Sequence, residues 1–235
     1  MPPAFLDSLV NLAYLLAAVL FIFALKGLQH PKTAVRGNLL GALGMLLAIV
    51  ATLVDRRIVG YEVIVAGVVV GAAAGTALAL KVRMTAMPQM VAILNGFGGG
   101  ASLLVAGAAL VETAQVGAGI PLVQLSVATV AAGLIGSVTF WGSLVAFGKL
   151  QGLTSERPIL LPGRYPLEVL LAGVALGLGA WVVADPTATQ AYWGLVAAAA
   201  LLGVLVVLPI GGADMPVAIS LLNSYSGLAA AAAGF

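Results

Sequence analysis

Long apolar runs alternate with short polar connections along nearly the whole chain. Within each run the apolar residues are continuous, and Ala, Leu, Val and Gly predominate. Runs of about 20 apolar residues match helices that cross a bilayer, whereas strands of a membrane barrel alternate over about 10 residues. The pattern predicts spanning helices at about residues 5–27, 33–53, 60–80, 87–111, 121–148, 166–184, 190–208 and 214–233.

Composition supports this interpretation. Hydrophobic residues make up 62% of the chain and charged residues 8%, against about 25% charged residues in an average soluble domain. So few charged residues cannot cover a surface that faces water. We therefore expect an all-α, polytopic transmembrane helix bundle with about eight helices, forming one domain over residues 1–235. The absence of cysteine excludes disulfides and thiolate ligands. The net charge of +2 is too small to indicate a nucleic-acid partner.

The basic residues predict the orientation of the helices. When the connections are assigned to alternate sides of the bilayer, eight Lys and Arg residues fall on one side, and only Arg56 and Arg57 fall on the other. Connections on the cytoplasmic side carry the Lys and Arg excess. We therefore expect the N-terminus to face away from the cytoplasm and the turn at Gly211–Asp214 to face it. An even number of helices then puts the C-terminus outside, which favours a truncated chain.

Small residues at four-residue spacing predict close packing between helices, because they let two backbones approach each other. The rows are Gly37/Gly41, Gly67/Gly71/Gly75, Gly96/Gly100 and Gly173/Gly177.

Polar residues inside the predicted spans are the candidates for function, because an unpaired polar group in hydrocarbon is costly. They form three stripes at helical spacing: Asn95, Gly99 and Ser102; Ser126, Thr129, Gly133 and Ser137; and Ser220, Asn223 and Gly227. The stripes fit a hydrated path through the bundle, but they equally fit hydrogen-bonded seams between helices.

Two further features leave alternatives open. Asp214 stands at the predicted start of the last helix, where its carboxylate fits an N-cap, or the mouth of a proton or cation path. The stretch Gly96–Ala101 fits a loose dinucleotide-binding fingerprint, but that motif requires a turn between a strand and a helix, and here it lies inside an apolar helix. We find no metal-ligand cluster and no catalytic set, so the residues alone predict a membrane bundle without a catalytic site, in which an ion path and hydrogen-bonded seams both remain open.

Three stretches resemble the membrane domain of the beta subunit of proton-translocating NAD(P) transhydrogenases. They are Gly211–Pro216 continuing through Leu222–Phe235, Met87–Asn95, and Val138–Leu150. The resemblance implies an enzyme of the prokaryotic inner membrane that exchanges hydride between NAD(H) and NADP(H) while moving protons. It also implies partners: alpha-side membrane and NAD(H)-binding subunits, and a dimer of such protomers. One further helix and an NADP(H)-binding domain are expected after Phe235, so this chain by itself would bind neither nucleotide.

The resemblance also assigns roles to individual residues. Asp214 and Asn223 match family positions for proton coupling, whereas at Asn95 the family often has a histidine that is thought to carry the proton. An amide cannot titrate, so we expect the titrating group to come from an alpha-side helix. The predicted proton path and coupling residues are Asn95, Ser102, Ser126, Thr129, Ser137, Asp214, Ser220 and Asn223. The alternative function is a secondary transporter or channel-like subunit for an ion or small solute, although no internal repeat supports it.

Overall fold

The computed structural model describes residues 3–54, 61–116 and 122–234, and within these ranges all the regular structure is helical. The main helices are α1 (Pro3–Leu28), α2 (Pro31–Val54), α3 (Glu62–Lys81), α4 (Met87–Val116), α5 (Leu122–Leu150), α6 (Arg164–Ala184), α7 (Thr189–Val207) and α8 (Met215–Ala233). Short 3₁₀ turns precede α4 and α8, as η1 (Met84–Ala86) and η2 (Gly212–Asp214).

The predicted all-α class is confirmed, and each predicted span overlaps one of these helices; the predicted starts at residues 60 and 121 lie outside the described residues. In the described part of the chain, eight helices are long and apolar enough to cross a membrane. The largest difference is at the end of α4, which continues to Val116 rather than 111. Proline stands in the first turn of α4 and α8, where its missing N–H removes no helical hydrogen bond. The chain is therefore a multi-pass membrane protein.

The chain divides into two compact units, residues 1–77 and 78–235, and each is described by itself. In the first unit, α1 and α2 pack along each other. Gly37 allows this contact, since a Cβ there would lie 2.8 Å from the carbonyl oxygen of Ala24. Tyr14 and Thr52 also share a hydrogen bond of 2.9 Å between α1 and α2. Beside the row Gly67/Gly71/Gly75 on α3, the described residues place no atom within 4 Å of the added Cβ positions, so they show no packing of this row.

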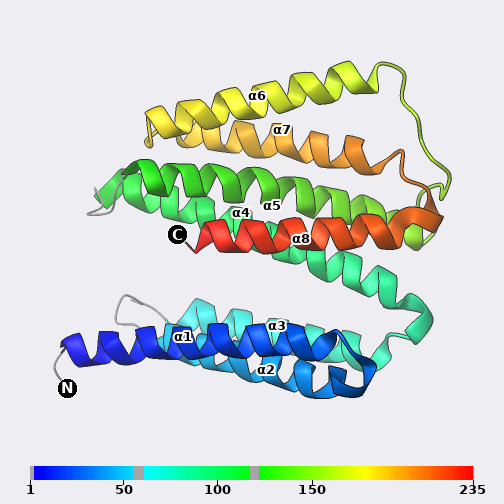
Figure 1. Ribbon diagram of the computed structural model, residues 1–235. Coiled ribbons are helices and arrows are strands. Elements are labelled where there is room, and N and C mark those ends of the chain that lie inside the picture. The colour runs from blue at the N-terminus through cyan, green and yellow to red at the C-terminus, as the bar shows by residue number, and fades with distance from the viewer. Residues whose placement is uncertain (1–2, 55–60, 117–121, 235) are drawn as a thin grey trace. The chain divides into compact units, whose positions relative to one another are not determined.

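The second unit is a bundle in which α5 is central, because it contacts α4, α6, α7 and α8 (Figure 1). Tyr192 of α7 is buried between Gly107 and Gly133 and donates its hydroxyl hydrogen to the Leu103 carbonyl. One apolar cluster surrounds Tyr192, and a second lies near the start of α8, around Met215. The row Gly173/Gly177 on α6 has open space beside it, as the α3 row does.

Candidate functional site

The interface between α4 and α5 holds the buried polar pair on which the candidate site is built. These helices approach closely at two glycines: a Cβ on Gly99 would lie 2.7 Å from the Gly136 carbonyl oxygen, and a Cβ on Gly136 would lie 2.7 Å from that of Gly99. Either distance is shorter than a real Cβ contact allows. Glycine is therefore required on both helices, and this contact brings the neighbouring side chains of α4 and α5 together.

Asn95 lies one turn from this crossing on α4 and is 7% exposed. Its Nδ2 donates a hydrogen bond of 3.0 Å to Oγ of Ser143 on α5, which is fully buried. The amide oxygen of Asn95 is also buried and has no hydrogen-bond partner among the described residues. An acceptor left unpaired in this way costs about 1–3 kcal/mol, so the pair is not simply a satisfied link between two helices.

Thr139 adds a second buried oxygen to the same face of α5, since it lies one turn before Ser143. Thr139 is completely buried, and its hydroxyl oxygen has no hydrogen-bond partner in the described structure. A Cβ on Gly99 would lie 3.0 Å from the Thr139 Cβ, which places this hydroxyl beside the α4 contact. The side chains of Asn95, Thr139 and Ser143 are called the α4–α5 polar seam below.

Gln89 lies at the end of the same interface, in the first turn of α4. Its Nε2 donates a hydrogen bond of 3.0 Å to the carbonyl oxygen of Leu150, the last residue of α5. Its Oε1 is buried without a hydrogen-bond partner among the described residues. Buried side-chain oxygens without a partner among the described residues therefore occur both inside the α4–α5 interface and at its end. In protein interiors, such oxygens commonly accept hydrogen bonds from ordered water.

The predicted stripe on α5 lies on another face of that helix. Ser126, Thr129 and Ser137 are buried as expected, but Ser137 donates its hydroxyl hydrogen to the Val196 carbonyl of α7 at 2.7 Å. Gly133, between them, packs against the Tyr192 ring of α7. This stripe is therefore a packing seam between α5 and α7, separate from Asn95.

Ser102, the other predicted residue of α4, is buried and bonds within its own helix. Its hydroxyl donates to the Gly98 carbonyl at 3.0 Å, one turn earlier. Serine commonly satisfies its hydroxyl in this way inside a membrane helix. Ser102 therefore shares α4 with Asn95, but among the described residues its hydroxyl makes no hydrogen bond to a side chain of α5.

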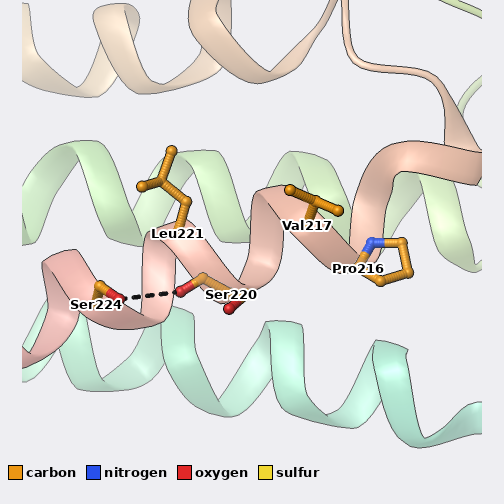
Figure 2. Close-up of a pocket in the computed structure, with 5 residues that line it drawn as sticks. All are labelled: Pro216, Val217, Ser220, Leu221 and Ser224. Carbon is orange, nitrogen blue, oxygen red and sulfur yellow. Dashed lines mark hydrogen bonds between the residues drawn. The ribbon is translucent and has the colours of Figure 1, made fainter.

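The predicted α8 stripe lies on the surface of the described chain. Ser220 and Asn223 are both exposed, although Asn223 stands near the middle of α8. Ser220 and Ser224 line a shallow pocket with Pro216, Val217 and Leu221, and Figure 2 shows the hydrogen bond of 3.4 Å from Ser224 to the Ser220 carbonyl. Among the residues that the structure describes, the three predicted stripes therefore do not meet around one path.

Asp214 takes the N-cap position of α8, as one of the two alternatives predicted. Its side chain makes no capping hydrogen bond and is exposed. The turn before it is held elsewhere, since the Gly212 N–H donates to the Glu156 carbonyl at 2.8 Å. The N-cap position is thus confirmed, whereas the hydrogen bond that would make Asp214 an N-cap stabiliser is not formed.

Residue patterns missed Ser143 and Thr139, the partners of Asn95 on α5. Both fall in the stretch Val138–Leu150 that carries the family resemblance, and their spacing of four residues puts them on one helical face. That spacing could have identified the two residues from the sequence.

The described residues contain no group of three or more His, Cys, Asp or Glu side chains that could hold a metal ion. Gly96–Ala101 is helical throughout, so it is no dinucleotide-binding turn.

Comparison with known proteins identifies the family. The sequence model of the NAD(P) transhydrogenase beta subunit family matches residues 10–235. The chain belongs to this family. Two proteins named NAD(P) transhydrogenase subunit beta, both from Rhodospirillum rubrum and one from a named strain, are each 45% identical to it over 235 aligned positions. The match covers 97% of this chain and 50% of each relative, so the chain spans about half the length of the curated relatives it matches.

Family membership agrees with the resemblance inferred from the three sequence stretches. The family model and both relatives carry the name of the NAD(P) transhydrogenase beta subunit. The α4–α5 polar seam, which includes Asn95, is the candidate functional site of this membrane-spanning part.

Proposed function

We propose that this chain forms the proton-conducting membrane domain of a transhydrogenase, which couples hydride exchange between NAD(H) and NADP(H) to proton movement across the bilayer. The observation that carries the proposal is the α4–α5 polar seam in a member of this family, with unpaired oxygens on Asn95 and Thr139. Such oxygens accept hydrogen bonds from water, and a water chain conducts protons. Nucleotides would bind in other parts of the enzyme, including an NADP(H)-binding domain beyond residue 235.

Asn95 would act by arranging water, because an amide has no titrating group in the physiological range. Its Nδ2 is already engaged by Ser143, which fixes the amide plane and leaves Oδ1 as the acceptor. A titrating side chain would come from a membrane helix of the alpha side. Ser102, Ser126, Thr129 and Ser137 would then support the bundle around the seam.

The exposed polar face of α8 supports an alpha-side partner. Ser220, Asn223 and Ser224 share one side of the helix at spacings of three and four residues, and all are exposed in this chain. An amide near the middle of a spanning helix is costly against lipid and is normally covered by protein. A polar helix of the alpha-side membrane subunit would cover Asn223, in a dimer of such protomers.

Coupling between the nucleotides and the protons would be conformational, because the hydride itself does not cross the bilayer. Asp214 lies at the start of α8 and is exposed, so a nucleotide domain on that side could contact it directly. The charge distribution supports a cytoplasmic position for this turn in the inner membrane, with the N-terminus outside.

The test is Asn95→Leu in the complete enzyme, reconstituted into vesicles. Proton movement that depends on NADP(H) should fall about tenfold or more, which corresponds to about 1.4 kcal/mol of barrier, while assembly is retained. Asn11→Leu makes the same change at an exposed position of α1 and should leave proton movement unchanged.

Two results would contradict the proposal. Unchanged coupling in Asn95→Leu would remove Asn95 from the proton path. Solute flux through the wild-type protein that does not depend on nucleotide would instead favour the transporter alternative.

A further inference from the structure

Lys149 is a buried cation whose side chain joins two helix ends. It lies in the last turn of α5 and is completely buried, whereas Lys26, Lys32 and Lys81 are exposed. Its Nζ donates hydrogen bonds to the carbonyl oxygens of Leu208, Ile210 at 2.8 Å and Arg157 at 3.4 Å. An ammonium group has three donors, so this side chain is fully engaged, and every acceptor belongs to the main chain.

The acceptors explain why a charge is tolerated here. Leu208 is the C-cap of α7, where carbonyl groups lack helical partners and the helix dipole is negative. A cation at this end is favourable, and it satisfies orphan carbonyls that would otherwise be buried unpaired. Lys149 therefore acts as a C-cap for α7 that is supplied by a different helix.

The connection between α5 and α6 is bonded to the same turn. The N–H of Ile159 donates to the Leu208 carbonyl at 3.2 Å, and the Gly212 N–H donates to the Glu156 carbonyl at 2.8 Å. Lys149 thus sits where residues 156–159 meet residues 208–212. These two segments and the Lys149 side chain are called the Lys149 latch below.

The latch lies between the polar seam and the start of α8. Val207 and Met215, on either side of the turn, pack with Ala92 of α4 and Ala146 of α5 in one apolar cluster. Ser143 precedes Lys149 by six residues, or about 9 Å along α5 at 1.5 Å per residue. A shift of the turn relative to α5 would therefore change the packing beside Asn95 and Ser143.

We propose that Lys149 is a positioning residue for coupling: it fixes the turn between α7 and α8 to the end of α5, so that movement at Asp214 reaches the polar seam. The proposal rests on the proposed function. Lys149 itself transfers no proton in this scheme, because carbonyl oxygens hold all three N–H donors of its ammonium group.

The first experiment replaces Lys149 by Met in the complete enzyme in vesicles. Methionine fills a similar volume without a charge, so the three carbonyl groups lose their donor. We expect proton-linked transhydrogenation to fall about tenfold, while hydride exchange in detergent, without a proton gradient, stays within about twofold of wild type. Lys81→Met, at an exposed helix end, should change neither rate.

A disulfide across the latch separates positioning from any other role of the charge. A Cβ on Gly212 would lie 3.3 Å from the Glu156 Cβ, close to the roughly 3.5–4.5 Å of a disulfide. These 235 residues contain no cysteine, so within them Glu156→Cys with Gly212→Cys gives one defined pair, and the enzyme without the two substitutions is the control for thiols elsewhere. We expect the cysteine pair to oxidise severalfold more slowly when Lys149→Met is also present than when Lys149 is retained. The oxidised triple variant should regain proton-linked activity, and reduction of its disulfide should abolish that activity.

Each outcome decides the proposal. Normal coupling in Lys149→Met, oxidation that is independent of Lys149, or an oxidised triple variant that stays uncoupled would overturn it. If Lys149→Met assembles only when the disulfide is present, the positioning role is supported; failure to assemble even then counts against it. Wild-type vesicles without nucleotide-dependent proton movement would refute the proposed function instead, and the oxidation rates would still report on the latch.

Discussion

At the residue scale, the difference between satisfied and unsatisfied polar atoms distinguishes the candidate site from ordinary packing. Ser102 and Ser137 both give their hydroxyl hydrogens to carbonyl oxygens. Asn95 and Thr139 each keep a buried oxygen without a partner among the described residues. Because an unpaired buried acceptor is costly, these atoms are where water would bind, and the sequence alone could not separate the two classes.

Thr139→Val tests this interpretation. Valine has nearly the same shape as threonine but no hydroxyl, and removing an unpaired hydroxyl should leave the free energy of unfolding within about 1 kcal/mol of wild type. We expect normal thermal stability but slower proton-linked turnover in vesicles. Thr113→Val is the matched control, since the Thr113 hydroxyl is bonded to the Ala109 carbonyl within α4. Equal turnover in the two variants would show that the Thr139 hydroxyl is not on a water path.

At the element scale, glycines decide which helix faces meet. Of the glycine rows that the sequence predicted to pack, Gly37 and Gly96 touch another helix, whereas Gly67/Gly71/Gly75 and Gly173/Gly177 have open space beside them. The tightest contact between α4 and α5, at Gly99 and Gly136, was not part of any predicted row. Glycine spacing therefore predicts that a helix can pack closely, but not which row does so within one chain.

Gly99→Ala should weaken the contact between α4 and α5. Its Cβ would lie 2.7 Å from the Gly136 carbonyl, so the helices must separate, at a cost of about 1–3 kcal/mol. The thermal unfolding midpoint of the purified complex in detergent should fall accordingly. Gly177→Ala, which meets no atom within 4 Å, should leave this midpoint unchanged, and a similar fall in both variants would contradict the packing argument.

A substitution at Asp214 tests whether this residue stabilises the start of α8 or couples nucleotide binding to proton movement. Because its side chain makes no capping hydrogen bond, Asp214→Asn should yield as much folded complex as wild type. We expect it to impair proton-linked activity while hydride exchange without a proton gradient persists. Asp7→Asn, at an exposed site of α1, serves as the control. A parallel loss of folded complex and activity would instead show that the negative charge of Asp214 stabilises the start of α8.

At the scale of the whole molecule, the orientation in the bilayer stays a prediction from charge. The contacts of the second unit agree with it in one respect, since the connection after α5 bonds to the turn after α7, and both were assigned to the cytoplasmic side. These 235 residues contain no cysteine, so a single thiol introduced among them can report the side of each connection when its labelling is compared with that of the unsubstituted protein.

Leu153→Cys and Thr187→Cys provide that measurement. Leu153 lies in the connection between α5 and α6, and Thr187 lies between α6 and α7; both are exposed. An impermeant thiol reagent added outside intact cells should label the Thr187 variant, while the Leu153 variant should react only after the membrane is opened. The reverse pattern would invert the predicted topology.

The sequence by itself determined the number, extent and class of the helices, because bilayer thickness sets the length of an apolar run and each run is a local property. It also determined the family, through three contiguous stretches. The tertiary structure decided which side chains meet: Asn95 with Ser143, Lys149 with carbonyl groups 59 and 61 residues away in sequence, and Asn223 on the surface. These contacts depend on the rotation of each helix, which is fixed by close glycine contacts with distant segments and not by the pattern of any one span.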